Sequence, residues 1–429
     1  MTASLSATSS PASAPRASWL EPWLDGLPPA AGPLEAVQTR GRRALREQPL
    51  PSARQEDWRF TDLALLQDLP LAPLAGGDGL EAAAGAGAAA LPAPEPGVLR
   101  LVLDGHRDPL AGLTLPEGLQ ALTATEIAQG LGHTLAATGC EQHWPVEFNH
   151  AAATTVLALR VLSRKRVRLE LVSAAGAGLL PLRLLLVLEE KAELELSQVV
   201  QAPGPGAISL LVEAHLARSA RLQHGLVALG HPQAALLGHL ALEQEPESSV
   251  GLTAVSAGWG LVRLEPRVLQ VDGQAQTTLR GLQVVDGRQI ADTHSHVRFN
   301  GPEGQLDQLH KAVASGQSRS VFNGAVRVPR EAQRTNAAQL SRSLLLSDRA
   351  RIDTKPELEI VADDVKCAHG ATVSSLQTDE LFYLQSRGIG STQAAQLLQR
   401  AFCEEVLRDL PAAARAWCPL EALLRGFEP

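Results

Sequence analysis

Apolar and polar residues alternate along the chain from about Val156 to Leu376. Stretches such as VLALRVLSRKRVRLELV, LRLLLVLEEKAELELSQVV and ISLLVEAHLARSARLQHGLVAL break only at Gly, Pro or charged residues. Because successive side chains of a β-strand point to opposite faces of a sheet, this period of two predicts a long series of strands. No long amphipathic helix interrupts them, which argues against alternating βαβ units.

Short corners that carry an Ala or a Ser recur through the same region. Examples are EEKAELEL, ARSARLQ, EPESSVGL, DGQAQTTL, SGQSRSVF and SDRARIDT. Most of them follow the preceding corner within about 15 to 30 residues, the range in which solenoid coils repeat. We therefore predict a mainly β fold built as a solenoid, with a β-sandwich as the structural alternative.

Helical periodicity precedes the strand region. Apolar residues recur every three or four positions in PLEAVQTRGRRALRE (33–47) and EDWRFTDLALLQDL (56–69), and a further helix is expected from about Ala124 to Thr138. The stretch from Pro70 to Gly97 is rich in Ala, Gly and Pro and is typical of a linker.

Two more helices are expected after the strands. TDELFYLQSRG has Thr378 as a candidate N-cap and Gly388 as a C-terminal stop, and the next helix begins at Ser391 and stops at Pro411. One face of this second helix would be apolar and formed by Ala394, Leu397, Leu398, Ala401, Phe402 and Val406.

Four regions follow from these patterns. Residues 1–18 form a disordered tail, and residues 19–97 form an N-terminal helical region with its linker. Residues 98–376 form the β-solenoid core with a short helical segment near its start, and residues 377–429 form a C-terminal helical domain.

Composition narrows the function classes. The 429-residue chain has no apolar run long enough for a membrane span, and its net charge of -8 with only five lysines leaves no basic stripe for nucleic acid. Its four cysteines, Cys140, Cys367, Cys403 and Cys418, form no C-x-x-C motif and favour a reducing compartment. We expect the cytoplasm, with the chloroplast stroma as the alternative if the Ser- and Ala-rich N-terminus is a transit peptide.

The stretch ADDVKCAHGATVSSL carries the first candidate site. On a strand, Cys367 and His369 project to the same side with Cα atoms about 6.5 to 7 Å apart, so they could share a ligand. Thiolate and imidazole suit zinc, iron or an iron–sulfur cluster, but two ligands cannot close a four-coordinate site. The alternative is a buried thiol that packs as a small hydrophobe beside a hydrogen-bonded imidazole.

A weaker candidate metal site lies in DTHSHVR, where Asp292, His294 and His296 also alternate along a strand. Ordinary strand histidines are the alternative there. No phosphate-binding G-x-x-x-x-G-K-[ST] loop, G-x-S-x-G elbow or H-E-x-x-H helix occurs in the sequence. The chain therefore does not hydrolyse ATP through such a loop.

Three motifs occur together and in order: TKPELEI (354–360), ADDVKCAHGAT (362–372) and LFYLQSRGI (381–389). With their neighbours in residues 323–389 they closely resemble the C-terminal core of the SufB/SufD family, and EDWRFTDL (56–63) resembles its N-terminal motif. The chain lacks the cysteine-rich N-terminal segment of some SufB members, which favours the other branch of the family.

The resemblance implies a right-handed parallel β-helix between N- and C-terminal helical regions. It further implies a non-catalytic scaffold of iron–sulfur cluster assembly that pairs with a SufB-like paralogue, while a SufC-like ABC ATPase hydrolyses ATP. The ATPase would bind the C-terminal helices, where the family motif places Leu381, Phe382, Tyr383 and Arg387. The isolated chain could also form a homodimer.

The same resemblance shifts the interest from the cysteine to the histidine. His369 occupies the position of the histidine implicated in cluster assembly opposite a cysteine of the SufB-like partner, and Cys367 matches the accompanying cysteine. The implied cofactor is a transient Fe–S cluster at the interface with the partner; a flavin is conceivable, but no residue supports it.

Two enzyme hypotheses stand beside the scaffold. A β-helix enzyme such as a polysaccharide lyase would fit the solenoid pattern, although aromatic residues make up only 3% of the chain and offer little for sugar stacking. A self-contained metal or thiol enzyme would use Cys367 and His369 directly.

Overall fold

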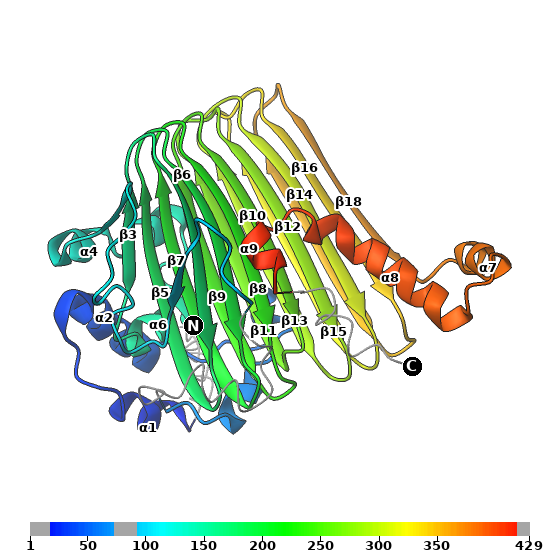
Figure 1. Ribbon diagram of the computed structural model, residues 1–429, viewed down its shortest axis with the longest axis horizontal. Coiled ribbons are helices and arrows are strands. Elements are labelled where there is room, and N and C mark those ends of the chain that lie inside the picture. The colour runs from blue at the N-terminus through cyan, green and yellow to red at the C-terminus, as the bar shows by residue number, and fades with distance from the viewer. Residues whose placement is uncertain (1–17, 73–91, 418–429) are drawn as a thin grey trace, which may run out of the picture.

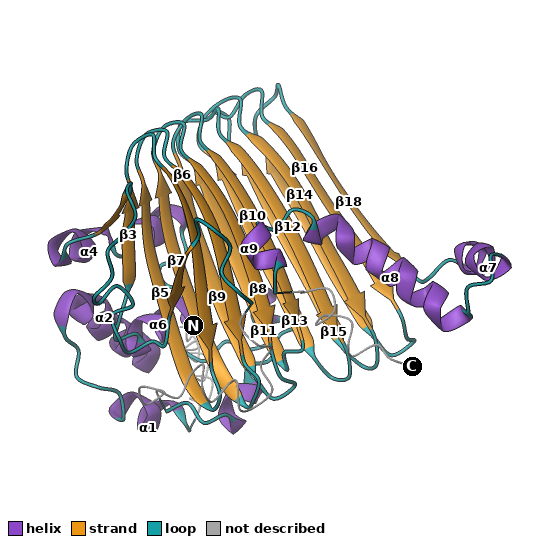
Figure 2. Cartoon of the chain, viewed as in Figure 1, coloured by secondary structure: helices purple, strands orange, loops and turns teal. Residues whose placement is uncertain are grey.

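The computed structural model describes residues 18–72 and 92–417. The expected N-terminal tail, most of the linker and Cys418 lie outside the described residues. Two long parallel sheets face each other along the described core, and the helices lie outside the stack of strands (Figure 1, Figure 2).

The chain alternates between the two sheets, which we call sheet I and sheet II, and each new strand pairs with the strand of the preceding coil. All pairings are parallel except β2 with β3. This is a parallel β-helix, which confirms the solenoid prediction.

Sheet I contains β2 (Leu119–Ala121), β3 (Leu157–Val161), β5 (Gly178–Leu188), β7 (Gly206–Leu216), β9 (Ala235–Gln244), β11 (Leu261–Gln270), β13 (Ile290–Phe299), β15 (Arg319–Val328) and β17 (Arg351–Ile360). Sheet II contains β1 (Leu99–Val102), β4 (Arg166–Ala174), β6 (Glu193–Gln201), β8 (Arg221–Leu229), β10 (Ser249–Ala257), β12 (Gln276–Val285), β14 (Gln305–Ala314), β16 (Asn336–Leu345) and β18 (Lys366–Ser374).

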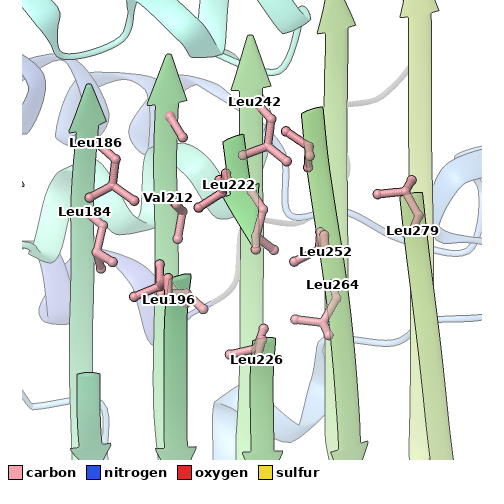
Figure 3. Close-up of a cluster of buried hydrophobic side chains, with 14 of the residues drawn as sticks. Leu184, Leu186, Leu196, Val212, Leu222, Leu226, Leu242, Leu252, Leu264 and Leu279 are labelled. Carbon is pink, nitrogen blue, oxygen red and sulfur yellow. The ribbon is translucent and has the colours of Figure 1, made fainter. Parts of the chain in front are cut away.

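Register makes the interior repetitive. Ala235 pairs with Leu261 and Arg319 pairs with Arg351, so from β3 onward one coil takes from 26 to 32 residues. Since strand side chains alternate, a residue that points inward lies directly over an inward residue of the next coil. Inward-facing leucines and valines therefore stack from both sheets into one core, including Leu184, Leu196, Val212, Leu222, Leu252, Leu264 and Leu279 (Figure 3).

Four of the Ala and Ser corners, those at Lys191, Ser219, Glu247 and Gln274, are tight turns from sheet I to sheet II that stack along one side of the β-helix, whereas SGQSRSVF and SDRARIDT lie on the other side. These four residues have φ between 55° and 63°, a left-handed conformation that is unfavourable for residues other than glycine. Backbone hydrogen bonds to the next coil offset this strain, as from Lys191 N to Arg218 O (3.1 Å) and from Ser219 N to Pro246 O (3.0 Å). The following residue is small and fully buried, as at Ala192, Ala220, Ser248 and Ala275.

The N-terminal helices cover the outer face of sheet I. They are α1 (Leu20–Asp25), α2 (Glu35–Glu47), α4 (Ala124–Gly130), α5 (His133–Thr138) and α6 (Trp144–Ala152), with 3-10 turns η1 (Gly32–Leu34), η2 (Glu56–Trp58) and η3 (Ala64–Asp68). Trp23, Trp58 and Phe148 pack there against outward residues of β5, β7, β9 and β11.

Residues 56–69 do not form the expected α-helix. Only the two 3-10 turns η2 and η3 form, because side chains between them make other hydrogen bonds. The Asp62 carboxylate accepts the Ala64 N–H at 2.8 Å, and the Thr61 hydroxyl donates to Asp292 on sheet I. The apolar side chains are nevertheless buried, so the pattern indicated burial rather than helix type.

The C-terminal helices are α7 (Thr378–Ser386), α8 (Ser391–Leu407) and α9 (Ala412–Arg415). Thr378 begins α7 as its first residue rather than as its N-cap, which is Gln377, while Gly388 follows the helix with φ 84° as a glycine stop requires. Helix α8 lies along the outer face of sheet II, and α7 projects beyond the last coil (Figure 1).

The apolar face predicted for α8 is only partly correct: Ala394 and Val406 are buried, and Leu398 and Phe402 are half-buried. Leu397 and Ala401 are exposed, and the buried residues are Ala394, Gln399, Cys403, Val406 and Leu407. The helix is oriented by its anchor on sheet II, where the buried Lys311 ammonium donates to the Phe402 carbonyl at 2.8 Å and pairs with Glu405. That contact turns Cys403 and Val406 toward the outward valines of the sheet.

None of the helices within residues 18–72 and 92–417 is both long enough and apolar enough to cross a membrane.

The corner residues provide a test of the coil packing. Replacing the fully buried Ala220 by Leu should lower the free energy of unfolding by about 1–3 kcal/mol, because the extra volume has no space inside the turn. The exposed neighbour Arg221→Leu is the matched control and should change stability by less than about 0.5 kcal/mol. Chemical denaturation followed by circular dichroism would measure both; equal effects would contradict the packing described for the corner.

Candidate functional site at the open end of the β-helix

The last coil has a neighbour on one side only. Strands β17 and β18 are the terminal strands of sheets I and II, so each presents an unpaired edge of backbone N–H and C=O groups within the described chain. Apolar side chains are exposed beside these edges, including Val361 at 56% and Val373 at 46%. Unpaired edges bounded by exposed apolar residues are the kind of surface that another chain covers.

Cys367 and His369 lie on β18 and share its inward face. In register with β16, Cys367 lies over Ala337 and His369 lies over Gln339, and both of these partners are buried. Cys367 is half-buried and packs against the apolar core, whereas His369 is exposed because no further coil of the described chain covers it. The structure therefore brings the two side chains to one face at the open end.

A column of inward-facing residues in sheet II leads to His369. It runs from Leu252 and Leu279 through Gln308 and Gln339 to His369, so it changes from apolar to polar over the last coils. The Gln339 amide donates to the Gln308 carbonyl oxygen at 2.9 Å, and the Gln308 amide donates to the Ser295 hydroxyl at 2.7 Å. The side-chain oxygen of Gln339 is buried and has no hydrogen-bond partner among the described residues.

Burial of the Cys367 side chain raises the pKa of its thiol, and a hydrogen bond with the Ala337 backbone offsets part of that shift. The thiol is therefore protonated near neutral pH and would have to lose its proton to bind a metal. No hydrogen bond or ion pair holds the His369 side chain within the described residues.

Chemically, this end of the β-helix offers one soft and one borderline ligand on an accessible face. Zinc and iron–sulfur sites usually need four such ligands. Asp363 and Asp364 are both exposed at the preceding corner, and the Asp364 backbone is held by Arg334 and Gln333 of the coil before. The two side chains on β18 could therefore supply part of a coordination shell, but not a complete one.

The weaker candidate on β13 lies on the outer face of sheet I, under the N-terminal segment. Asp292 pairs with Arg263 at 2.6 Å and contacts His294 at 3.0 Å. Burial would raise the pKa of Asp292, but the charge of Arg263 and the contact with His294 hold it below its usual value. Burial lowers the pKa of His296 to about 4. Among the described residues, no group of three ligand atoms within 4.8 Å of one another includes Asp292, His294 and His296.

Helix α7 and its C-cap residue Arg387 carry the four residues expected to bind an ATPase. No residue of α7 is buried; Phe382 is 69% exposed, Tyr383 is exposed, and the Arg387 guanidinium lies 5.3 Å from the centre of the Tyr383 ring. Leu381 is half-buried. The helix therefore presents two aromatic side chains that the rest of the described chain does not cover.

Two groups of residues escaped the sequence analysis. The Gln308, Gln339 and His369 column lies at intervals of one coil, but coil length varies, so the sequence carries no signal that fixes this register. The other group, which contains His239 and Glu265, also spans one coil, but its third member comes from a loop far away in the sequence.

The fold is a parallel β-helix whose terminal strand carries Cys367 and His369 on one face. Residues 171–402 match the family described as SUF system FeS cluster assembly, SufBD core domain. An iron–sulfur cluster assembly SufBD family protein of Synechocystis is 34% identical over 394 residues, which cover 85% of each chain. The iron–sulfur cluster assembly protein SufD of Escherichia coli is 33% identical over 197 residues, 46% of each chain. Protein ABCI7, chloroplastic, of Arabidopsis thaliana is 40% identical over 202 residues, 47% of this chain and 42% of its own length.

The chain belongs to the SufBD family of iron–sulfur cluster assembly proteins. This confirms the resemblance drawn from the three C-terminal motifs.

The cysteines should differ in reactivity. Cys367 is only half-buried, whereas burial raises the pKa of Cys140 to about 11 and that of Cys403 to about 12. We expect iodoacetamide to modify Cys367 before Cys140 and Cys403 in the folded chain, at a rate that rises with pH through the alkaline range because the thiolate fraction grows. Peptide mapping by mass spectrometry measures the order, and the urea-unfolded chain is the control. Labelling of Cys403 as fast as Cys367 in the folded chain would contradict the burial described for α8.

Proposed function

We propose that this chain is the SufD-type scaffold subunit of a SUF assembly complex, in which it pairs with a SufB-like paralogue and binds a SufC-like ABC ATPase. The observation that carries the proposal is the place of His369: it lies on the inward face of the terminal strand, exposed only because the β-helix ends there. The Escherichia coli relative is the iron–sulfur cluster assembly protein SufD, which supports the same assignment.

The partner solenoid would cover the open end. A paralogous β-helix could extend sheets I and II across the edges of β17 and β18, so that backbone groups unpaired in this chain gain partners. It would also bury Val361 and Val373. A second copy of this chain offers the same edges, so a homodimer of the isolated chain is expected to compete with the heterodimer.

An iron–sulfur cluster is the cargo of this complex rather than a resident group. His369 would supply an imidazole, Cys367 could supply a thiolate once deprotonated, and the partner would supply the remaining ligands. The unpaired oxygen of Gln339 lies in register beneath His369 and could accept a hydrogen bond from the imidazole N–H that faces away from the iron. Such a contact would fix the tautomer of His369.

The chain itself would act as a scaffold without catalysis, and ATP hydrolysis would take place on the partner. Family membership accounts for the β-helix, so the polysaccharide-lyase alternative has no observation of its own. The free cysteines Cys140, Cys367 and Cys403 suit a reducing compartment. We propose the cytoplasm; the chloroplast name of the Arabidopsis relative supports the stroma as the alternative.

The role of His369 is tested with the reconstituted complex under anaerobic conditions. His369→Ala should lower the amount of cluster formed, measured by visible absorption and bound iron and sulfide, by about tenfold or more, since even supporting residues of a metal site account for about 10–100-fold. The variant should still co-purify with its partners, because the side chain makes no contact that holds the coil together.

Thr372→Ala is the matched control, since Thr372 lies on the same strand but on its other face. It should leave the cluster yield unchanged. Unchanged yield in His369→Ala would remove the proposed role of this residue, and a Cys367→Ser variant would show separately whether the thiol contributes.

The aromatic pair on α7 predicts where the ATPase binds. Replacing Phe382 and Tyr383 together by Ala should weaken ATPase binding by about 30-fold or more, because truncating aromatic anchors at an interface typically costs about 2 kcal/mol or more. Val102→Ala removes an exposed apolar side chain at the other end of the β-helix and should have no effect. Titration calorimetry with the purified ATPase distinguishes the two outcomes; equal affinities would place the ATPase elsewhere.

A further inference from the structure

Three potential metal ligands meet on the outer face of sheet I, away from the terminal coil. His239 on β9 and Glu265 on β11 are neighbours in register, and His143 reaches them from the loop that caps the start of α6. The two strand residues are buried, and the imidazole rings of His143 and His239 stand nearly perpendicular, at 85°. The rest of the chain brings these residues together from two coils and a loop.

The three ligand atoms form a nearly equilateral triangle. The distance from His239 Nε2 to Glu265 Oε2 is 3.1 Å, that from His143 Nδ1 to Glu265 Oε2 is 3.3 Å, and that between the two nitrogens is 3.3 Å. Ligands about 2.0–2.1 Å from a tetrahedral metal ion stand about 3.3 Å from one another. The triangle therefore has the size of one face of such a coordination tetrahedron.

Hydrogen bonding alone explains these distances less well. Charge-assisted bonds to a carboxylate are usually about 2.7–2.9 Å long, and both His–Glu contacts exceed that range. The two histidine nitrogens lie 3.3 Å from each other, and both also face the same carboxylate oxygen. If both nitrogens donated hydrogen bonds, they would have to share this oxygen as their acceptor. A cation at equal distance from all three atoms satisfies the lone pair of each.

The surroundings of the triangle favour the protonation states of His239 and Glu265 that can bind a metal ion. Burial lowers the pKa of His239 to about 4, so its imidazole is neutral at physiological pH. Glu265 is ionised: Arg263 Nε lies 2.7 Å from its Oε1, and Arg267 Nη2 lies 3.3 Å from its Oε2. The Arg263 contact orients the carboxylate so that Oε2 faces the two histidines, as the supporting residues of metal sites do.

Solvent reaches the triangle from one side. A cleft of 230 Å³ borders it, lined by His143 and Glu265 together with Trp58, Trp144, Asp57 and Gln55. His239 lies behind these residues and does not line the cleft. A metal held by the three ligands would have its remaining coordination position open to this cleft, as in sites that exchange water or a further ligand.

We propose that His143, His239 and Glu265 bind one divalent transition-metal ion of the class that prefers two imidazoles and a carboxylate, zinc(II) or iron(II). Two histidines with one carboxylate are the ligand set of catalytic zinc sites and of non-haem iron(II) sites. This site is independent of the terminal coil and of its proposed role in cluster assembly.

The experiment uses the full chain carrying Cys367→Ser and His369→Ala, so that the terminal coil cannot contribute metal ligands. After treatment with a chelator, cobalt(II) is added as a spectroscopic probe, and zinc(II) and anaerobic iron(II) are titrated by calorimetry. We expect one equivalent of metal, visible cobalt bands of a four- or five-coordinate site, and no thiolate-to-cobalt band in the near ultraviolet. The relative affinities for zinc and iron identify the metal preferred.

Two variants test the ligands. Glu265→Gln keeps the shape of a ligand but removes its charge, and His143→Ala changes a partly exposed loop residue that should not impair folding. Each should weaken binding by about 100-fold or more, since loss of a direct ligand exceeds the roughly 10–100-fold effect of a supporting residue. His215→Gln is the matched control because His215 also contacts two glutamates, Glu243 and Glu245, on sheet I.

The outcomes are distinct. Absence of a stoichiometric cobalt spectrum in the parent chain, or unchanged affinity in His143→Ala, would overturn the site and leave an ion-pair cluster only. If Glu265→Gln loses its native circular dichroism, His143→Ala alone decides. Loss of metal binding in both variants with the control unaffected would establish the site, whatever the result for His369 in cluster assembly.

Discussion

The in-register stacking of coils is the constraint on which the rest of the structure depends. Each inner strand satisfies its backbone groups on both sides, and its side chains meet those of the same position one coil away. This forces similar residues into columns, such as the outward valines Val172, Val199, Val227 and Val255 of sheet II. The rule holds until the last coil, where β17 and β18 have no further neighbour within the described chain. The candidate site lies where the stacking stops.

The interior of the β-helix changes character toward that end. In the column that leads to His369, Leu252 and Leu279 are followed by Gln308 and Gln339. Polar groups buried among apolar ones are costly unless they are hydrogen-bonded, and the two glutamines satisfy most of this demand through each other and Ser295. The oxygen that lacks a partner lies next to the open end. A partner chain that completes the stack would close this surface and place its own residues beside His369.

Helices cover parts of the outer faces of both sheets. On sheet II, the buried Lys311 holds α8 in place while α7 stands free with Phe382 and Tyr383 exposed. This arrangement gives a rigid attachment and an accessible aromatic surface on successive helices. On sheet I, the N-terminal helices and turns bury charged residues that would otherwise face water. Ion pairs such as Arg263 with Asp292 compensate that burial, and the same cover brings His143 to His239 and Glu265.

The sequence by itself determined the local pattern: strands, their small buried corners, the helical flanks, and the shared face of Cys367 and His369, because alternation is a relation between residues two apart. It also identified the family through motifs that are continuous in the chain. The sequence did not predict the 3-10 turns at residues 56–69, because side-chain hydrogen bonds there compete with an α-helix. It also did not predict that Leu397 is exposed, because the buried face of α8 depends on how the helix packs against sheet II. Only the tertiary structure decided which residues of different coils meet. From β3 onward coils vary between 26 and 32 residues, so the register that stacks Gln339 under His369 or Glu265 beside His239 cannot be counted along the chain; it is set by packing and hydrogen bonding between coils.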